Sequence, residues 1–273
     1  MVKLAFWDTV NGAYRYVFAH PLMIVRTGWV YLLLNGVNFS LRAVPHRPWS
    51  LSVLAVVVSV LVFATSIAWH IALLRAILLG EQSWRVALQF KHRHWRIVGV
   101  TLLLMVVVVP AAAVAIVIGV VAAHIGGPLA IVVDALIGLA ALVAMDLGPR
   151  IYLMAPAIAI DDPAKAIRAA WLRGRRNTQR LFFGSLLMIL PVMIVAAIAG
   201  GLVGVLLFAA QGVTPAEWFA QLGPAGHAAL GFAQAAVQIV ISAFGITFSA
   251  LAYKQLAQNW RPPPSFAATL IDT

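Results

Sequence analysis

Long apolar runs separated by short polar turns dominate the chain and predict its secondary structure. Six runs exceed the roughly 18 residues that indicate a membrane-crossing helix. They span about 22–41, 51–79, 97–122, 129–154, 181–209 and 228–252. We therefore expect an all-α polytopic membrane protein with six transmembrane helices.

Three shorter stretches have apolar residues on one helix face and polar residues on the other. In residues 4–19 the apolar face is Trp7, Val10, Tyr14, Val17 and Phe18, and the polar face is Asp8, Asn11 and Arg15. In residues 80–94 a polar stripe contains Glu81, Arg85, Gln89 and His92. Such helices typically lie in the membrane interface.

The third amphipathic stretch, residues 163–173, follows an acidic turn. Asp162 suits the N-cap, Pro163 the first helical position, and Gly174 the residue that closes the helix. Each of the three stretches precedes a pair of apolar runs. The sequence thus predicts three transmembrane hairpins, each preceded by a short interfacial helix.

The recurrence of this pattern predicts one transmembrane domain, residues 1–255, built from three repeat-like units. The units are about 1–79, 80–160 and 161–255, although sequence identity between them is poor. Residues 256–273 contain Arg-Pro-Pro-Pro-Ser-Phe and are expected to form a disordered cytoplasmic tail.

Composition and charge support a membrane protein. Hydrophobic residues are 63% of the chain and charged residues 10%, against about 25% charged in soluble domains. The net charge is +11, but the basic residues cluster at the ends of apolar runs, so we expect no nucleic-acid partner. With both termini cytoplasmic, 17 of the 19 Lys and Arg lie inside, and only Arg42 and Arg47 lie outside.

The chain has no cysteine, which excludes disulfides, thiolate metal sites and thiol nucleophiles. His92 and His94 lie on different helix faces and lack an acidic partner at ligand spacing. We expect neither a metal nor a cofactor.

The end of the fourth run has a distinctive order of residues. Pro149-Arg150-Ile-Tyr-Leu-Met-Ala-Pro156 is followed by the turn Asp161-Asp162-Pro163, then by Ala-Ile-Arg-Ala-Ala-Trp171. This order resembles bacterial membrane proteins similar to the glycerophosphoryl diester phosphodiesterase membrane domain and their YciC-like relatives. The stretch from Trp69-His70 to Gly80-Glu81 resembles the matching segment of stand-alone members.

The resemblance implies a six-span protein of the bacterial inner membrane, in a family of mostly unknown function. Some relatives carry an attached phosphodiesterase barrel. This chain has no room for that barrel and lacks its paired histidines and acidic residues. The resemblance therefore implies no catalytic activity here.

One group of ionisable residues is expected within or near the membrane-spanning runs. Asp146 and Arg150 are spaced to pair on one helix, and Arg75 and Arg26 lie at cytoplasmic ends of neighbouring runs. His70 follows Trp69 in the second run. We expect a structural pair at Asp146–Arg150, with a transport or catalytic carboxylate as the alternative.

Basic residues also gather in two cytoplasmic turns. They are Lys91, Arg93 and Arg96 in one turn, and Arg173, Arg175, Arg176 and Arg180 in the other. Each can gain about 1 kcal/mol from anionic lipid near the membrane surface. Orientation of the chain explains these clusters by itself, and headgroup binding is the additional hypothesis.

Spaced small residues predict close helix packing, at Ala115/Gly119, Gly200/Gly204 and Gly245/Ser249. No nucleophile–base pair, convergent carboxylates or Gly-rich phosphate loop can be found. We expect a non-enzymatic integral membrane protein that engages anionic lipid or a partner membrane protein, in a scaffolding or membrane-homeostasis role. The alternative is a transporter or lipid-translocating protein that uses an Asp146/Arg150 site.

Overall fold

The fold was analysed in a computed structural model of the 273-residue chain. The residues that the structure describes are 3–43, 48–81, 92–102, 148, 150, 152–160, 166–175, 177–212, 217 and 223–258. Within these ranges the protein is all-helical and contains no strand.

Four helices are long and apolar enough to cross a membrane. They are α2 (Pro21–Ala43), α3 (Trp49–Leu79), α9 (Thr178–Gln211) and α11 (Pro224–Gln258). They coincide with the predicted runs at about 22–41, 51–79, 181–209 and 228–252, so these helices are confirmed. The runs at about 97–122 and 129–154 lie mainly outside the described residues. The described chain therefore supports four membrane-spanning helices, and six remains a prediction.

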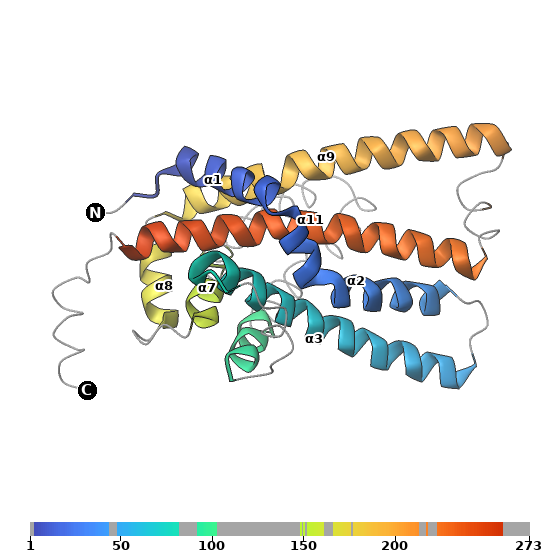
Figure 1. The fold of residues 1–273 in the computed structure, drawn as a ribbon, viewed down its shortest axis with the longest axis horizontal. Helices are drawn as coiled ribbons and strands as arrows, with labels where there is room; N and C mark the ends of the chain where they lie inside the picture. The colour runs from blue at the N-terminus through green and yellow to red at the C-terminus, as the bar shows by residue number, and fades with distance from the viewer. Residues whose placement is uncertain are drawn as a thin grey trace, which may run out of the picture.

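Helix α11 lies at the centre of the bundle, with α9 along one side and α2 along the other (Figure 1). Helix α3 packs on α2 and also reaches α11. In the most apolar window of α11, 61% of the residues are buried, compared with 17–28% in the other three long helices. The outer helices thus present broad apolar faces around a buried central helix.

The exposed faces of the outer helices are strongly apolar. Val56 and Val60 on α3 are 64% and 61% exposed, and Val195 on α9 is 66% exposed. Large contiguous apolar surfaces are rare on soluble monomers. A bilayer accounts for these faces, since apolar side chains have no free-energy cost against lipid tails.

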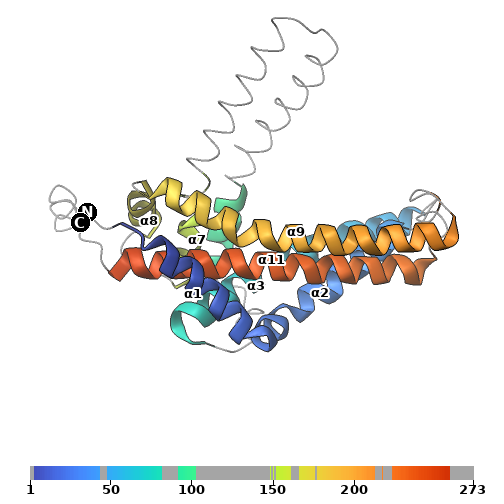
Figure 2. The same ribbon diagram turned by 90° about the horizontal axis from the view of Figure 1, so that it is seen from above.

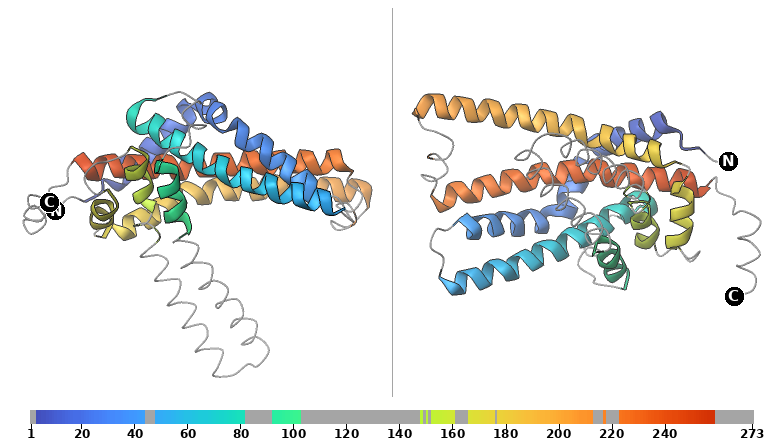
Figure 3. Two further views of the ribbon diagram at one scale, coloured as in Figure 1. Left: turned by 90° about the horizontal axis from the view of Figure 1, so that it is seen from below. Right: turned by 180° about the vertical axis from the view of Figure 1, so that it is seen from behind.

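Burial is most complete at one end of the bundle. This end contains the start of α1 and the end of α11. There, three shorter helices surround the long ones: α1 (Phe6–Ala19), α7 (Met154–Ala159) and α8 (Ala166–Arg175) (Figure 3). Residues 243–250 of α11 are buried without interruption, together with most of residues 67–76 of α3. The core of the fold therefore lies at this end.

The predicted amphipathic helix at 4–19 is confirmed as α1, but part of its apolar face has a protein partner. It lies across α11 and α9 (Figure 2), and Val10, Ala13 and Val17 are buried in that contact. The Tyr14 hydroxyl donates to the Leu187 carbonyl of α9 over 2.7 Å. Tertiary packing thus covers the middle of the predicted apolar face, whereas Trp7 and Phe18 of that face remain 65% and 72% exposed.

Two glycines lie at or next to the ends of described helices, and one of them, Gly174, was predicted to close its helix. Gly80 ends α3 in the left-handed conformation, with φ 72°, and its N–H donates to the Ala76 carbonyl. The prediction that Gly174 closes the third amphipathic helix is wrong, because α8 continues to Arg175. A Cβ at Gly174 would lie 3.3 Å from the Leu153 side chain and 3.4 Å from the Arg150 Cα, so this glycine permits close helix contact.

Several predicted features lie partly outside the residues that the structure describes. Residues 92–102 are helical, but most of the predicted helix at 80–94, and Asp162 and Pro163, are outside the described residues. The units 1–79 and 161–255 each contain a short helix followed by two long ones. The middle unit is mostly undescribed, so the threefold repeat stays a prediction. Helix α11 reaches Gln258, into the tail predicted at 256–273.

Candidate functional site

The start of α1, the end of α8, the start of α9 and the end of α11 meet at the densely packed end of the bundle. The Leu4 N–H donates to Asn177 Oδ1 over 2.9 Å, and the Ala5 N–H donates to Gln255 Oε1 over 3.2 Å. Arg180 Nη1 donates to the Leu4 carbonyl over 2.5 Å. These bonds join residues that are 173–250 positions apart in sequence.

Four exposed cations belong to this meeting point or lie within two residues of its bonded residues, and we name the set the basic junction. Lys3 precedes Leu4, Arg175 lies two residues before Asn177, and Lys254 lies between Tyr253 and Gln255; the set is Lys3, Arg175, Arg180 and Lys254. Sequence analysis had identified Arg175 and Arg180 as candidates. It missed Lys3 and Lys254 because they are isolated in sequence and are brought together only by the packing of α1 and α11.

The other predicted basic residues have different environments. Arg173 is buried, and its guanidinium lies 5.4 Å from the centre of the Tyr253 ring of α11. Arg93 is buried in the 92–102 helix, whereas Arg96 is exposed. Lys91 and Arg176 lie outside the described residues. Burial of Arg173 and Arg93 distinguishes them from cations that are free to meet a headgroup.

The residues predicted to form an intramembrane polar group bind different elements. Arg75 forms a bidentate ion pair with Glu81, at 2.8 and 2.5 Å, and its Nη1 donates to the Ala159 carbonyl over 2.8 Å. Arg75 therefore fastens the end of α3 to α7. Arg26 is exposed on α2, with no hydrogen bond or ion pair to any other described residue.

Arg150 contacts both α8 and the start of α9 in the same region. Its guanidinium lies 5.3 Å from the centre of the Trp171 ring of α8, and its Nε donates to Thr178 Oγ1 over 3.3 Å. Asp146, its predicted partner, lies outside the described residues. The described contacts of Arg150 hold α8 and the start of α9.

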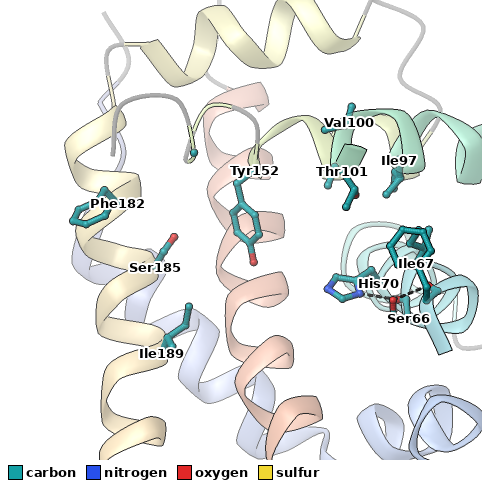
Figure 4. A pocket seen from close by; sticks show the side chains of 13 residues that line it. Ser66, Ile67, His70, Ile97, Val100, Thr101, Tyr152, Phe182, Ser185 and Ile189 are labelled. Atoms are coloured by element: carbon teal, nitrogen blue, oxygen red, sulfur yellow. Dashed lines mark hydrogen bonds between the residues drawn. The ribbon is translucent and has the colours of Figure 1, made fainter. Parts of the chain in front are cut away.

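A cavity of about 550 Å³ lies between α3, α9 and the helical segment 92–102 (Figure 4). Most of its lining is apolar, and its polar members are Ser66, His70, Thr101, Tyr152 and Ser185. The remaining lining residues are Phe63, Ile67, Ile97, Val100, Gly148, Ala155, Phe182 and Ile189. Sequence analysis had identified His70 but not the cavity, because the cavity's walls come from four separate parts of the chain.

His70 has a defined hydrogen-bonding arrangement in this cavity. Its Nδ1 lies 2.7 Å from the Ser66 carbonyl, which can only accept a hydrogen bond. Nδ1 therefore carries the proton of the neutral ring, and Nε2 keeps its lone pair. Figure 4 shows the imidazole ring turned towards the cavity, on the side of Tyr152.

Tyr152 was not among the predicted site residues. Its hydroxyl forms a side-chain hydrogen bond with Ser249 of α11. A Cβ at Gly245 would lie 2.7 Å from the same oxygen. The predicted small pair Gly245/Ser249 is thus a packing position, for the tyrosine in particular. At Gly200, by contrast, an added Cβ would meet no described atom within 4 Å.

Among the described residues, no three His, Asp or Glu side chains are grouped as metal ligands would be. Comparisons of the chain with protein-family models, with curated proteins and with solved structures found no match. The described structure identifies a helical protein with four helices suited to crossing a membrane.

Proposed function

We propose that this is a non-enzymatic integral membrane protein that binds anionic lipid headgroups at its basic junction. The observation that carries the proposal is the gathering of exposed cations from four chain segments at one end of an apolar helix bundle. Lys3, Arg175 and Lys254 are each exposed and are far apart in sequence. Such a cluster attracts anionic headgroups, at about 1 kcal/mol for each cation near the surface.

The neighbourhood of the junction suits the membrane surface. Trp7, in the first turn of α1 and four residues after Lys3, is 65% exposed, and tryptophan is enriched at the level of lipid headgroups. The internal bonds of Leu4 and Ala5 hold the start of α1 rigidly against α9 and α11. Rigid positioning lowers the conformational entropy that headgroup binding would otherwise lose.

The excess of Lys and Arg near this end favours a cytoplasmic orientation of both termini. Membership in the bacterial inner-membrane family described above rests on the Pro149–Trp171 sequence pattern. Under this proposal the protein has a scaffolding or membrane-homeostasis role and uses no cofactor.

Native mass spectrometry of the protein extracted gently from its own membrane tests the proposal. We expect retained anionic lipid in the wild type and a clear loss in the Arg175→Ala/Lys254→Ala variant. The matched control is Arg15→Ala/Arg26→Ala, which removes the same charge from exposed positions elsewhere on α1 and α2. Equal lipid retention in both variants would overturn the proposal. A co-purifying protein that only the junction variant loses would make the junction a protein-binding surface.

Arg173 is unsuited to this test. Its guanidinium is buried over Tyr253, so its removal changes the packing of α8 on α11 as well as the charge. The transport alternative depends on Asp146 and Arg150. The Arg150 contacts with Trp171 and Thr178 favour a structural role for this arginine, and Asp146→Asn in a flux assay tests the alternative directly.

A further inference from the structure

We propose that the cavity between α3 and α9 binds an uncharged amphiphile with a free hydroxyl, of the long-chain alcohol or diacylglycerol type. This site is separate from the basic junction, and its ligand carries no charge. The proposal therefore goes beyond headgroup binding and stands or falls independently of it.

The size and lining of the cavity are those of a ligand site. Its volume of about 550 Å³ lies within the range of roughly 300–1,000 Å³ that is usual for small-molecule pockets. Its described lining is apolar apart from a few polar side chains, and these described residues include no Asp, Glu, Lys or Arg. Among these lining residues an ionised headgroup finds no opposite charge, so they suit an uncharged ligand best.

Three of the five polar lining residues already have partners. Ser66 donates to the Phe63 carbonyl over 2.7 Å, and Ser185 donates to the Leu181 carbonyl over 2.9 Å. The Tyr152 hydroxyl is bonded to Ser249. These side chains add polarity to the wall but are committed to hydrogen bonds within the protein.

The other two polar residues have unused capacity among the described residues. His70 Nε2 has a lone pair that meets no donor from the described part of the chain, since the ring's described hydrogen bond is made at Nδ1. Thr101, on the 92–102 helix, also has no described hydrogen-bond partner. Figure 4 shows both side chains at the cavity. A polar group without a partner is costly in a membrane interior, so the site favours a ligand that supplies one.

A hydroxyl matches both unused groups. It can donate its proton to an acceptor such as His70 Nε2 and accept one from a donor such as the Thr101 hydroxyl. An ether or ester oxygen can only accept, so it leaves the histidine lone pair without a donor. The hydroxyl selects the ligand, and the apolar wall holds its chain.

The test uses a diazirine-bearing hexadecanol and its methyl ether, each mixed into phosphatidylcholine vesicles that contain the full-length protein. After photolysis, mass spectrometry locates the labelled residues. We expect the alcohol to label cavity residues of α3 and α9, and the ether to label them about 2- to 10-fold less, as expected for one hydrogen bond. Equal labelling by the two probes, or labelling confined to other surfaces, would overturn the proposal.

Variants then identify the groups that select the hydroxyl. His70→Phe keeps a ring in the cavity but removes the acceptor, so the alcohol should lose its advantage over the ether. His70→Leu provides the same comparison if the phenylalanine variant does not fold. Thr101→Val removes a donor that either probe can use, so it should lower labelling by both while the alcohol keeps its advantage. Thr65→Val is the matched control, because the Thr65 hydroxyl bonds to the Leu61 carbonyl and is not part of the lining. An undiminished alcohol preference in a folded His70 variant would contradict the assignment.

Discussion

The Phe248 ring of α11 lies against the backbone of Gly184 in α9. A Cβ placed at residue 184 would lie 2.0 Å from the Phe248 Cζ, and Phe248 is fully buried. The two helices can approach this closely only because position 184 has no side chain. The pair is the tightest point of the interface between the central helix and α9 among the described glycine contacts.

Gly184→Ala should therefore destabilise the protein by about 1–3 kcal/mol, the usual cost of overpacking a core. Thermal unfolding in detergent should show a lower Tm. Gly200→Ala on the same helix is the control, since its added Cβ meets no described atom and alanine is the better helix former. An unchanged Tm for Gly184→Ala would show that Phe248 can move aside at little cost.

Tyr152 and Gly245 should be energetically coupled. Gly245→Ala places a methyl group 2.7 Å from the Tyr152 hydroxyl and should destabilise the fold. Tyr152→Phe removes that oxygen, so the double variant should be more stable than the sum of the two single effects predicts. A double-mutant cycle of unfolding free energies measures this coupling. Strictly additive effects would mean that the hydroxyl is not what excludes a side chain at 245.

Arg75 should not tolerate replacement by lysine. Its guanidinium binds both Glu81 carboxylate oxygens and the Ala159 carbonyl, and a lysine cannot make all three bonds. We expect Arg75→Lys to cost about 1–3 kcal/mol, the range for hydrogen bonds to charged groups, and to loosen α7 from α3. Hydrogen exchange at residues 154–159 should increase. Arg26→Lys on the surface of α2 is the control and should leave both measurements unchanged.

Arg173 and Arg175 are two positions apart on α8 and should behave differently. Arg173→Ala removes the contact with Tyr253 and should lower stability by about 1–2 kcal/mol, as expected for a desolvated cation–π contact. Arg175→Ala should leave stability unchanged and reduce retained anionic lipid. Thermal unfolding and lipid analysis of the same two preparations separate these effects. Loss of lipid in Arg173→Ala without loss of stability would reverse the two assignments.

The long helices could be predicted closely, because hydropathy is a property of the local sequence. The predicted run at 51–79 and the helix Trp49–Leu79 differ by two residues at one end only. Amphipathic α1 was also predicted, but whether its apolar face met lipid or protein depended on α9 and α11, which are more than 150 residues away. The periodic pattern of apolar residues shows that one face of a helix is apolar. It does not show whether lipid or protein covers that face.

The candidate sites were less predictable for the same reason. The basic turns were visible as runs of arginine, yet Arg173 and Arg175 differ in burial because of where α11 passes. Lys3 and Lys254 carried no local signal. His70 was recognised as polar within an apolar run, but its free Nε2 and the volume beside it depend on Thr101 and on α9. Contacts between residues far apart in sequence determine these properties. Such contacts cannot be predicted from the pattern of a single sequence.

The hydrogen bonds of Leu4 and Ala5 also constrain the order of biosynthesis. Their partners, Asn177 and Gln255, are translated about 170 and 250 residues later. Helix α1 can therefore reach its final position only after α9 and α11 have been made. Before α9 and α11 are made, the apolar face of α1 lacks these two partners. Its amphipathic pattern allows it to lie in the membrane interface during that time. Docking of α1 on α9 and α11 thus belongs to a late step of folding.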